Sequence, residues 1–226
     1  MILPALDERG SVEDVVRGFV AAGMRVVLVD NGSRDGTGAA ARSAGAEVVR
    51  EPVRGYGAAC LAGIRHLRES PPEFVVFADC DGTLDPAESG ELLGPLRAGE
   101  ADLVLGERGR VERGALPRHQ RVGNRIVCLA LRLFHRIRIC DVSPYRAARW
   151  ALISGLDLRE RTYGLPVETI VLARRAGAKI AERKVSYRRR SAGVSKVAGS
   201  PFAAARAGLL MLLLCVRLRF GREGTR

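Results

Sequence analysis

Residues 74–83 read Phe-Val-Val-Phe-Ala-Asp-Cys-Asp-Gly-Thr, an apolar run that ends in two carboxylates. The β-branched and aromatic run is typical of a buried strand in a parallel sheet. Asp79 and Asp81 follow that strand, at the edge where open α/β sheets bind ligands, and Gly82 allows the chain to turn. Two carboxylates at this spacing suit a Mg²⁺ or Mn²⁺ ion that also holds the phosphates of a nucleotide. The competing interpretation is a solvated Asp-Gly turn, which this stretch alone does not exclude.

Strand-like and helix-like segments alternate on both sides of this stretch. We expect strands at residues 1–5, 25–30, 46–50, 74–79 and 101–106, with helices at 11–22, 37–44, 57–68 and 86–97. This order predicts a single α/β domain with a mostly parallel central sheet flanked by helices. In the less regular second half we expect helices at 121–134, 167–176 and 208–220, and a strand at 179–187.

The charge of the chain is uneven. The 226 residues suffice for one sizeable domain, and their formal net charge is +12. Most of the excess comes from arginine-rich stretches after Glu107. Such an excess suits phosphorylated ligands, nucleic acid or an anionic membrane surface, and it places an anion-binding region in the second half.

Cysteine usage and hydropathy predict a cytoplasmic protein. The five cysteines are widely spaced and include no C-x-x-C pair, so neither a disulfide framework nor a zinc site is expected. The first residues do not have the pattern of a signal peptide. The longest apolar run, residues 207–216, is shorter than the roughly 20 residues that a membrane-spanning helix needs.

Three of the predicted strands end in acidic loops. Residues 4–8 read Pro-Ala-Leu-Asp-Glu, residues 30–37 read Asp-Asn-Gly-Ser-Arg-Asp-Gly-Thr, and residues 79–83 carry the carboxylate pair. Each loop alone is compatible with an ordinary polar turn. Because the carboxyl ends of parallel strands meet at one edge of a sheet, we predict that the three loops form one ligand site.

Taken in order, these motifs resemble those of the family 2 glycosyltransferases of the GT-A fold. The resemblance is closest to the polyprenyl-phosphate (dolichol-phosphate) mannosyltransferase-like branch and covers nearly the whole chain. The family pattern reads Pro-Ala-x-Asn/Asp-Glu, (Asp)-Asp-x-Ser-x-Asp-Gly-Thr, a glycine-rich helix start and Asp-x-Asp. The matching stretches are residues 4–8, 30–37, 54–59 and 79–83, followed by 106–108, 123–124, 141–146, Glu168 and 187–196. One departure is Ser-Pro-Tyr-Arg at 143–146, where the family has Ser-Gly-Phe-Arg.

The resemblance implies a role for individual residues. The implied nucleotide-sugar-binding residues are Pro4, Ala5, Glu8, Asp30, Gly57, Asp79 and Cys80. Asp79 and Asp81 are the implied ligands of a Mg²⁺ or Mn²⁺ cofactor, with Asp81 as the main one. The physical logic agrees, because a divalent cation stabilises the charge that develops on a departing nucleoside diphosphate.

The acceptor side is expected in the basic second half. The implied phosphate- or acceptor-binding residues are Arg108, Arg188, Arg190, Ser195 and Lys196. The basic stretch 183–196 could close over a phosphate as a lid, although an isolated run of this kind is more often a solvated loop. An acceptor hydroxyl would need a base, for which Glu168 and Asp141 are the candidates, whereas an acceptor phosphate needs only positioning. The sequence leaves both open.

We therefore expect a metal-dependent, inverting glycosyltransferase that moves a hexose from a UDP- or GDP-sugar to a polyprenyl phosphate or another phosphorylated or lipidic acceptor. Residues 1–200 would form the GT-A domain. Residues 201–226 would form an amphipathic helix and basic tail that packs on the domain, contacts a second copy in a homodimer, or lies on the inner face of the membrane.

Two alternatives remain at this point. A nucleotidyltransferase is expected to have a basic, glycine-rich loop after the first strand. This chain is acidic there, at Asp7 and Glu8, which disfavours that class of enzyme. A non-enzymatic adaptor that binds RNA or a membrane is disfavoured by Asp79 and Asp81, because two carboxylates repel a polyanion. Nucleic acid is further disfavoured because Tyr187 is the only stacking side chain in the basic stretch.

Overall fold

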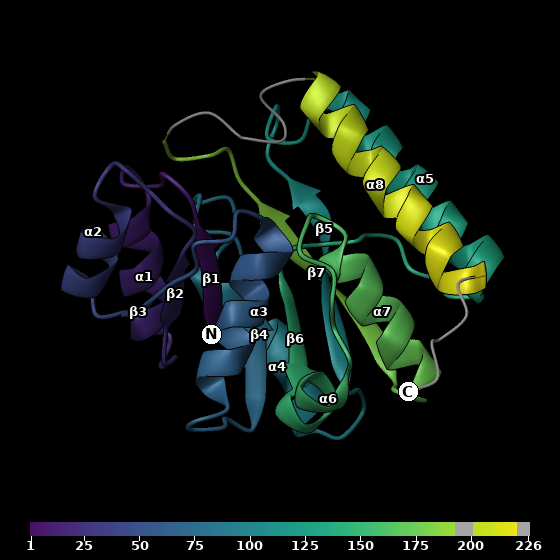
Figure 1. Ribbon diagram of the computed structural model, residues 1–226, viewed down its shortest axis with the longest axis horizontal. Helices are drawn as coiled ribbons and strands as arrows, with labels where there is room; N and C mark the ends of the chain where they lie inside the picture. Colours follow the sequence, from purple (N-terminus) through teal and green to yellow (C-terminus); the bar gives the residue numbers. More distant parts are fainter. Residues whose placement is uncertain (193–200, 221–226) are drawn as a thin grey trace.

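The computed structural model describes residues 1–192 and 201–220, which form an α/β fold around one seven-stranded sheet (Figure 1). The strand order is β3-β2-β1-β4-β6-β5-β7. The strands are β1 Ile2–Ala5, β2 Val27–Asp30, β3 Glu47–Arg50, β4 Phe74–Phe77, β5 Leu103–Val111, β6 Arg146–Arg149 and β7 Ile180–Tyr187. All pairings are parallel except those of β6, which is antiparallel to both β4 and β5. The predicted mostly parallel sheet is confirmed.

Helices cover both faces of the sheet (Figure 1). They are α1 Val12–Ala21, α2 Thr37–Ser43, α3 Tyr56–Leu67, α4 Ser89–Arg97, α5 Arg118–His135, α6 Trp150–Gly155, α7 Leu165–Arg175 and α8 Pro201–Phe220, with a short 3₁₀ turn η1 at Pro86–Glu88. The predicted elements are all present. Most ends differ by three residues or fewer, whereas β5 ends five residues later and α8 begins seven residues earlier than predicted. Neither β6 nor α6 is predicted from the sequence; the Arg-Ala-Ala-Arg of β6 lacks the β-branched residues that mark the other strands.

Alternation along each strand builds two separate cores. Val27 and Val29 belong to the core on the side of α3, α5, α7 and α8, whereas Leu28 between them belongs to the core on the side of α1, α2 and α4. The same alternation recurs at Val75 and Val76. Because successive side chains point to opposite faces, an almost continuous apolar strand can bury both of its sides.

Parallel register brings the acidic loops to one edge. Ala5 at the end of β1 pairs with Asp30 at the end of β2. Beyond the strands, the Glu8 amide donates to Thr37 Oγ1 at 2.8 Å, and the Ser11 hydroxyl donates to the Cys80 carbonyl at 2.8 Å. The three loops are therefore held together by direct hydrogen bonds.

The last described helix, α8, lies beside α5 at one end of the sheet (Figure 1). His135 Nε2 is 2.9 Å from the Cys215 carbonyl oxygen, and the rings of Phe134 and Phe220 meet edge to face at 6.3 Å. Within residues 1–192 and 201–220, no helix combines the length and the hydropathy that crossing a membrane requires.

Candidate active site

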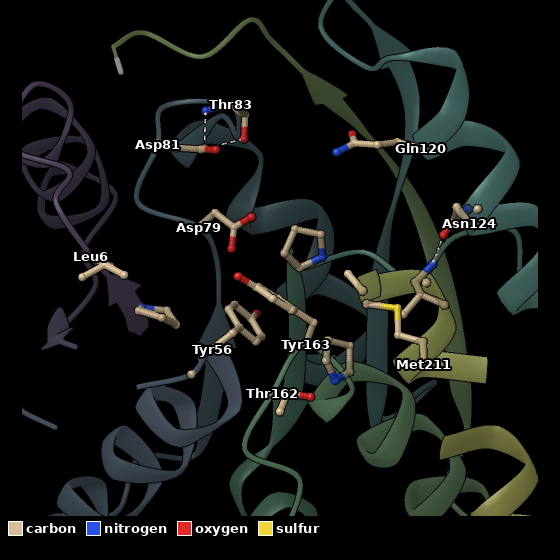
Figure 2. A pocket seen from close by; sticks show the side chains of 18 of the residues that line it. Leu6, Tyr56, Asp79, Asp81, Thr83, Gln120, Asn124, Thr162, Tyr163 and Met211 are labelled. Carbon is tan, nitrogen blue, oxygen red and sulfur yellow. Dashed lines mark hydrogen bonds between the residues drawn. The ribbon is translucent and has the colours of Figure 1, made fainter. Parts of the chain in front are cut away.

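A cavity of about 730 Å³ opens at the edge of the sheet where the acidic loops meet. The acidic loops form one side of it, and the first halves of α5 and α8 form the other (Figure 2). Eight of the predicted site residues line the cavity: Pro4, Ala5, Glu8, Asp79, Cys80, Asp81, Arg108 and Arg190. The structure thus brings the predicted donor side and two of the predicted acceptor arginines to one place.

The two carboxylates of the Asp-x-Asp motif have different surroundings. Asp81 Oδ1 accepts hydrogen bonds from the Thr83 amide at 3.1 Å and the Thr83 hydroxyl at 2.6 Å (Figure 2). Asp79, in contrast, has neither a hydrogen bond nor an ion pair to any side chain within the described ranges. Burial, reinforced by the negative charge of Asp81, raises the pKa of Asp79 well above its usual range.

This pair fits a divalent cation that is shared with a diphosphate. Three or more His, Cys, Asp or Glu side chains do not gather into a metal cage anywhere in the described part of the chain. Mg²⁺ commonly takes only one or two carboxylates and completes its shell with water and substrate phosphates. Asp79 lies partly exposed at the cavity wall beside a second carboxylate, where a bound cation would favour its ionised form.

Arg190 supplies a positive charge at this point in the structure. Its Nη1 lies 3.0 Å from Asp81 Oδ2, and its Nη2 pairs with Glu8 Oε2. Its Nε donates to the Ala192 carbonyl at 2.7 Å, which fixes the segment that follows β7 across the acidic loops. The predicted ligands Ser195 and Lys196 lie outside the described residues.

Arg108 and Asp141 form a rigid pair at the cavity wall. Arg108 Nε and Nη2 donate to the two carboxylate oxygens of Asp141 at 2.7 and 2.6 Å, and the Arg108 amide adds a third bond at 2.9 Å. Both side chains are largely buried. Asp141 does not line the cavity, so its placement favours holding Arg108 over acting as a base.

Four other predicted residues lie away from the cavity. Glu168 accepts the backbone amides of Arg159 and Glu160 at 3.0 and 2.8 Å, so its buried carboxylate ties down a loop. This placement favours a structural role over the predicted catalytic one. Asp30 is also buried and caps its own loop through the Ser33 amide at 2.8 Å.

Arg188 and Gly57 make contacts other than the expected ones. Arg188 pairs with Asp85 outside the cavity. A Cβ atom on Gly57 would lie 2.2 Å from the Glu160 carbonyl oxygen, so the close approach that this glycine permits is to another backbone segment. The expectation that Gly57 makes room for ribose or phosphate finds no counterpart in this geometry.

Several residues at the site are not predicted from the sequence. Tyr56 and Tyr163 lie beside Asp79 in the cavity (Figure 2). The Asn31 side chain donates to the Glu51 and Val53 carbonyls and so holds the loop before α3. Tyr56 and Asn31 lie in the motif stretches 54–59 and 30–37, but a tyrosine or an asparagine at these positions does not by itself indicate a specific role.

Arg146 is the most unusual of the missed residues. It is fully buried beneath the site, and its guanidinium lies 4.3 Å from the centre of the Phe77 ring. Nη1 donates to the Tyr56 hydroxyl at 3.1 Å, whereas Nε and Nη2 have no hydrogen-bond partner among the described residues. Its charge acts on Asp79 and opposes the upward shift of the pKa of that carboxyl.

An α/β sheet with an Asp-x-Asp pair at the cavity edge is the architecture of a nucleotide-sugar transferase of the GT-A fold. Residues 1–149 match glycosyl transferase family 2, and the chain belongs to this family. The predicted family is confirmed, and with it the class of enzyme, a glycosyltransferase. The nucleotidyltransferase and adaptor alternatives are thereby set aside.

Relatives with similar sequences and structures agree with this assignment. An uncharacterized glycosyltransferase of Mycobacterium tuberculosis is 39% identical over 200 residues, which cover 88% of this chain and 89% of the relative. Undecaprenyl-phosphate mannosyltransferase of Micrococcus luteus is 31% identical over 187 residues, covering 77% and 76% of the two chains. The crystal structure of glucosyl-3-phosphoglycerate synthase from Mycobacterium tuberculosis with Mn²⁺ and UDP-glucose superposes with a TM-score of 0.70 at 27% identity, covering 93% of this chain and 77% of that one.

Proposed function

We propose that this glycosyltransferase moves a hexose from a UDP- or GDP-sugar to a polyprenyl phosphate or a related phosphorylated or lipidic acceptor, with inversion at the anomeric carbon. The observation that carries the proposal is the two-sided cavity, with Asp79 and Asp81 on one side and Arg108 and Arg206 among its lining residues. Both relatives named above for their acceptors act on a molecule that carries a phosphate, one lipidic and one small.

On the donor side, Asp79 and Asp81 would hold Mg²⁺ or Mn²⁺, and the ion would stabilise the charge on the departing nucleoside diphosphate. Pro4, Ala5 and Cys80 line the same wall, where the nucleoside would lie. The loop that Asn31 anchors brings Tyr56 to this wall, where its ring can contact the base or the sugar.

On the acceptor side, the cavity wall combines cations with apolar side chains. Arg108, fixed by three hydrogen bonds to Asp141, can bind an acceptor phosphate without losing much side-chain entropy. Leu210 and Met211 of α8 supply an apolar surface for the part of a lipid acceptor next to its phosphate. An ionised phosphate needs no base to attack, which agrees with the engagement of Glu168 elsewhere.

Thermal unfolding with a panel of nucleotides tests the donor side. UDP or GDP should raise the melting temperature in the presence of Mn²⁺, because a ligand that binds only the folded state stabilises it. Asp81→Asn should remove the metal-dependent part of the shift, whereas Asp157→Asn, a change at an exposed carboxylate outside the cavity, should keep it. A full shift in Asp81→Asn would exclude the metal assignment.

Transfer of a radiolabelled hexose tests the acceptor. Undecaprenyl phosphate in detergent micelles and 3-phosphoglycerate in solution are offered separately, with UDP- or GDP-hexoses as donors. We expect the label in the lipid fraction. If the label enters only the phosphoglycerate fraction, the acceptor is a small phosphorylated molecule and the proposed lipid acceptor is wrong.

A further inference from the structure

Helix α5 presents a stripe of large apolar side chains to solvent. Val122, Ile126, Leu129 and Leu133 are all exposed, and Leu133 is exposed to 67%. Their spacing of four, three and four residues places them on one side of the helix. An apolar stripe of this kind usually packs against the core of the protein, yet in α5 it faces solvent.

Helix α8 repeats the pattern with the same spacing. Leu209, Leu213, Val216 and Phe220 are exposed, and Phe220 is exposed to 70%. Together the two helices carry eight of the eleven exposed large hydrophobic residues in the described part of the chain. Single exposed apolar residues are ordinary, but a concentration on two adjacent helices marks an interaction surface.

The charge beside the stripes is uniformly positive. Neither residues 118–135 nor residues 201–220 include an aspartate or glutamate. Exposed arginines follow the α5 stripe at three or four residues from its members: Arg118, Arg125, Arg132 and Arg136. A second copy of the same face would bring arginine against arginine, whereas a layer of anionic phosphates would complement it.

The same two helices border the cavity. Gln120 and Asn124 of α5 and Met211 of α8 line it, opposite the carboxylate pair (Figure 2). His119 and Arg206 of the same helices are also among the lining residues. A phosphate headgroup in a surface that lies against α5 and α8 would therefore be next to the cavity.

We propose that the α5–α8 face, defined by the eight exposed apolar residues, by Arg118, Arg125 and Arg132 of α5 and by Arg136 at its C-terminal cap, docks on the surface of an anionic phospholipid bilayer. The apolar side chains enter the boundary between headgroups and acyl chains, and the arginines contact lipid phosphates. The inference deepens the proposed function and rests on it, because it gives a lipid-phosphate acceptor its route to the site.

Vesicle sedimentation tests the surface with the full-length protein. Vesicles contain phosphatidylcholine alone, or equal parts of phosphatidylcholine and phosphatidylglycerol. We expect binding to the anionic vesicles that weakens as salt is added. Leu133→Gln/Leu213→Gln should lower the partition coefficient by about ten-fold or more, and Arg125→Gln/Arg132→Gln by about thirty-fold.

A matched pair of changes on the opposite part of the molecule serves as control. Val20→Gln/Arg42→Gln removes one exposed apolar residue and one exposed arginine from α1 and α2, and should leave vesicle binding unchanged. Melting curves with Mn²⁺ and UDP show that each variant is folded.

Three results would overturn the proposal. They are absence of wild-type binding to anionic vesicles, equal binding by the stripe variants, and a wild-type dimer in sedimentation velocity that Leu133→Gln/Leu213→Gln converts to a monomer. Transfer to undecaprenyl phosphate in detergent micelles does not need a bilayer. It therefore shows separately whether the proposed function stands.

Discussion

Asp79 links the chemistry of the site to the stability of the folded protein. Its carboxyl is partly buried beside Asp81 and has a raised pKa, so the folded protein binds a proton there more tightly than the unfolded chain does. The sign follows from linkage: a folded state that holds the extra proton loses stability as pH rises through the shifted pKa. A cation that pairs with the ionised carboxylate should offset this loss.

We therefore predict that the melting temperature of the metal-free protein falls as the pH is raised from about 6 to about 8, and that Mn²⁺ raises it more at the higher pH. Differential scanning calorimetry at both pH values measures the two effects. Asp79→Asn carries no ionisable group at this position. In this variant the fall of the melting temperature with pH should be smaller, and so should the extra stabilisation by Mn²⁺ at the higher pH. A Mn²⁺ effect that is larger at the lower pH would contradict the prediction.

Gly57 offers a test of packing at the level of a single atom. The Glu160 carbonyl and the Arg161 backbone would lie within 2.9 Å of a Cβ at this position, and backbone cannot rotate away as a side chain can. We expect Gly57→Ala to lower the free energy of unfolding by about 2–3 kcal/mol. Gly94→Ala in α4, where nothing lies within 4 Å, should instead stabilise by about 0.5–1 kcal/mol. Urea denaturation of the two variants checks the pair, and equal effects would exclude the packing explanation.

At the scale of elements, the segment after β7 crosses the acidic loops through Arg190. Its guanidinium pairs with both Asp81 and Glu8, so it is a cation beside the carboxylate that we assign to the metal. The two positive charges would compete for Asp81 unless the segment moves when the metal binds.

We predict that Arg190→Gln binds Mn²⁺ in the absence of nucleotide about ten-fold more tightly than the wild type, the equivalent of one hydrogen bond to a charged group. Isothermal titration calorimetry measures the affinity. Arg188→Gln is the control, because it removes an arginine from the same segment that pairs with Asp85 outside the cavity. Weaker Mn²⁺ binding by Arg190→Gln would show that the arginine supports the metal site instead of competing for it.

Much of the element order could be predicted because local signals agreed with the fold. Apolar runs such as 74–78 mark buried strands, and the loops after them carry the polar motifs. β6 could not be predicted, since its short Arg-Ala-Ala-Arg stretch becomes a strand only by pairing with β4 and β5. β5 precedes it by helix α5, and β4 by α4, β5 and α5.

The site shows the same division. The cavity residues of the acidic loops could be predicted because a strand end fixes where they lie. The contacts of Glu168 could not be predicted, because its carboxylate turns to the amides of a loop eight and nine residues earlier, a contact that only the tertiary structure determines. The contributions of Tyr163 and Met211 likewise depend on how α7 and α8 pack.

At the scale of the whole molecule, the cavity divides between two halves of the sheet. The acidic loops belong to the β3-β2-β1-β4 side, whereas α5 and α8 stand beyond β5 and β7 (Figure 1). The antiparallel strand β6 joins the two sides by pairing with β4 and β5. Donor and acceptor should therefore order different parts of the chain.

Hydrogen–deuterium exchange can resolve these parts. We predict that UDP with Mn²⁺ slows amide exchange in residues 4–8 and 79–83 and leaves residues 118–124 and 206–211 nearly unchanged, because a ligand raises the local free energy of opening only where it makes contacts. Adding a short-chain polyprenyl phosphate should then slow exchange in the two helical segments. In Asp81→Asn, the nucleotide should protect neither set. Protection of α5 and α8 by UDP and Mn²⁺ alone would mean that the nucleotide, not the acceptor, occupies the α5–α8 side of the cavity.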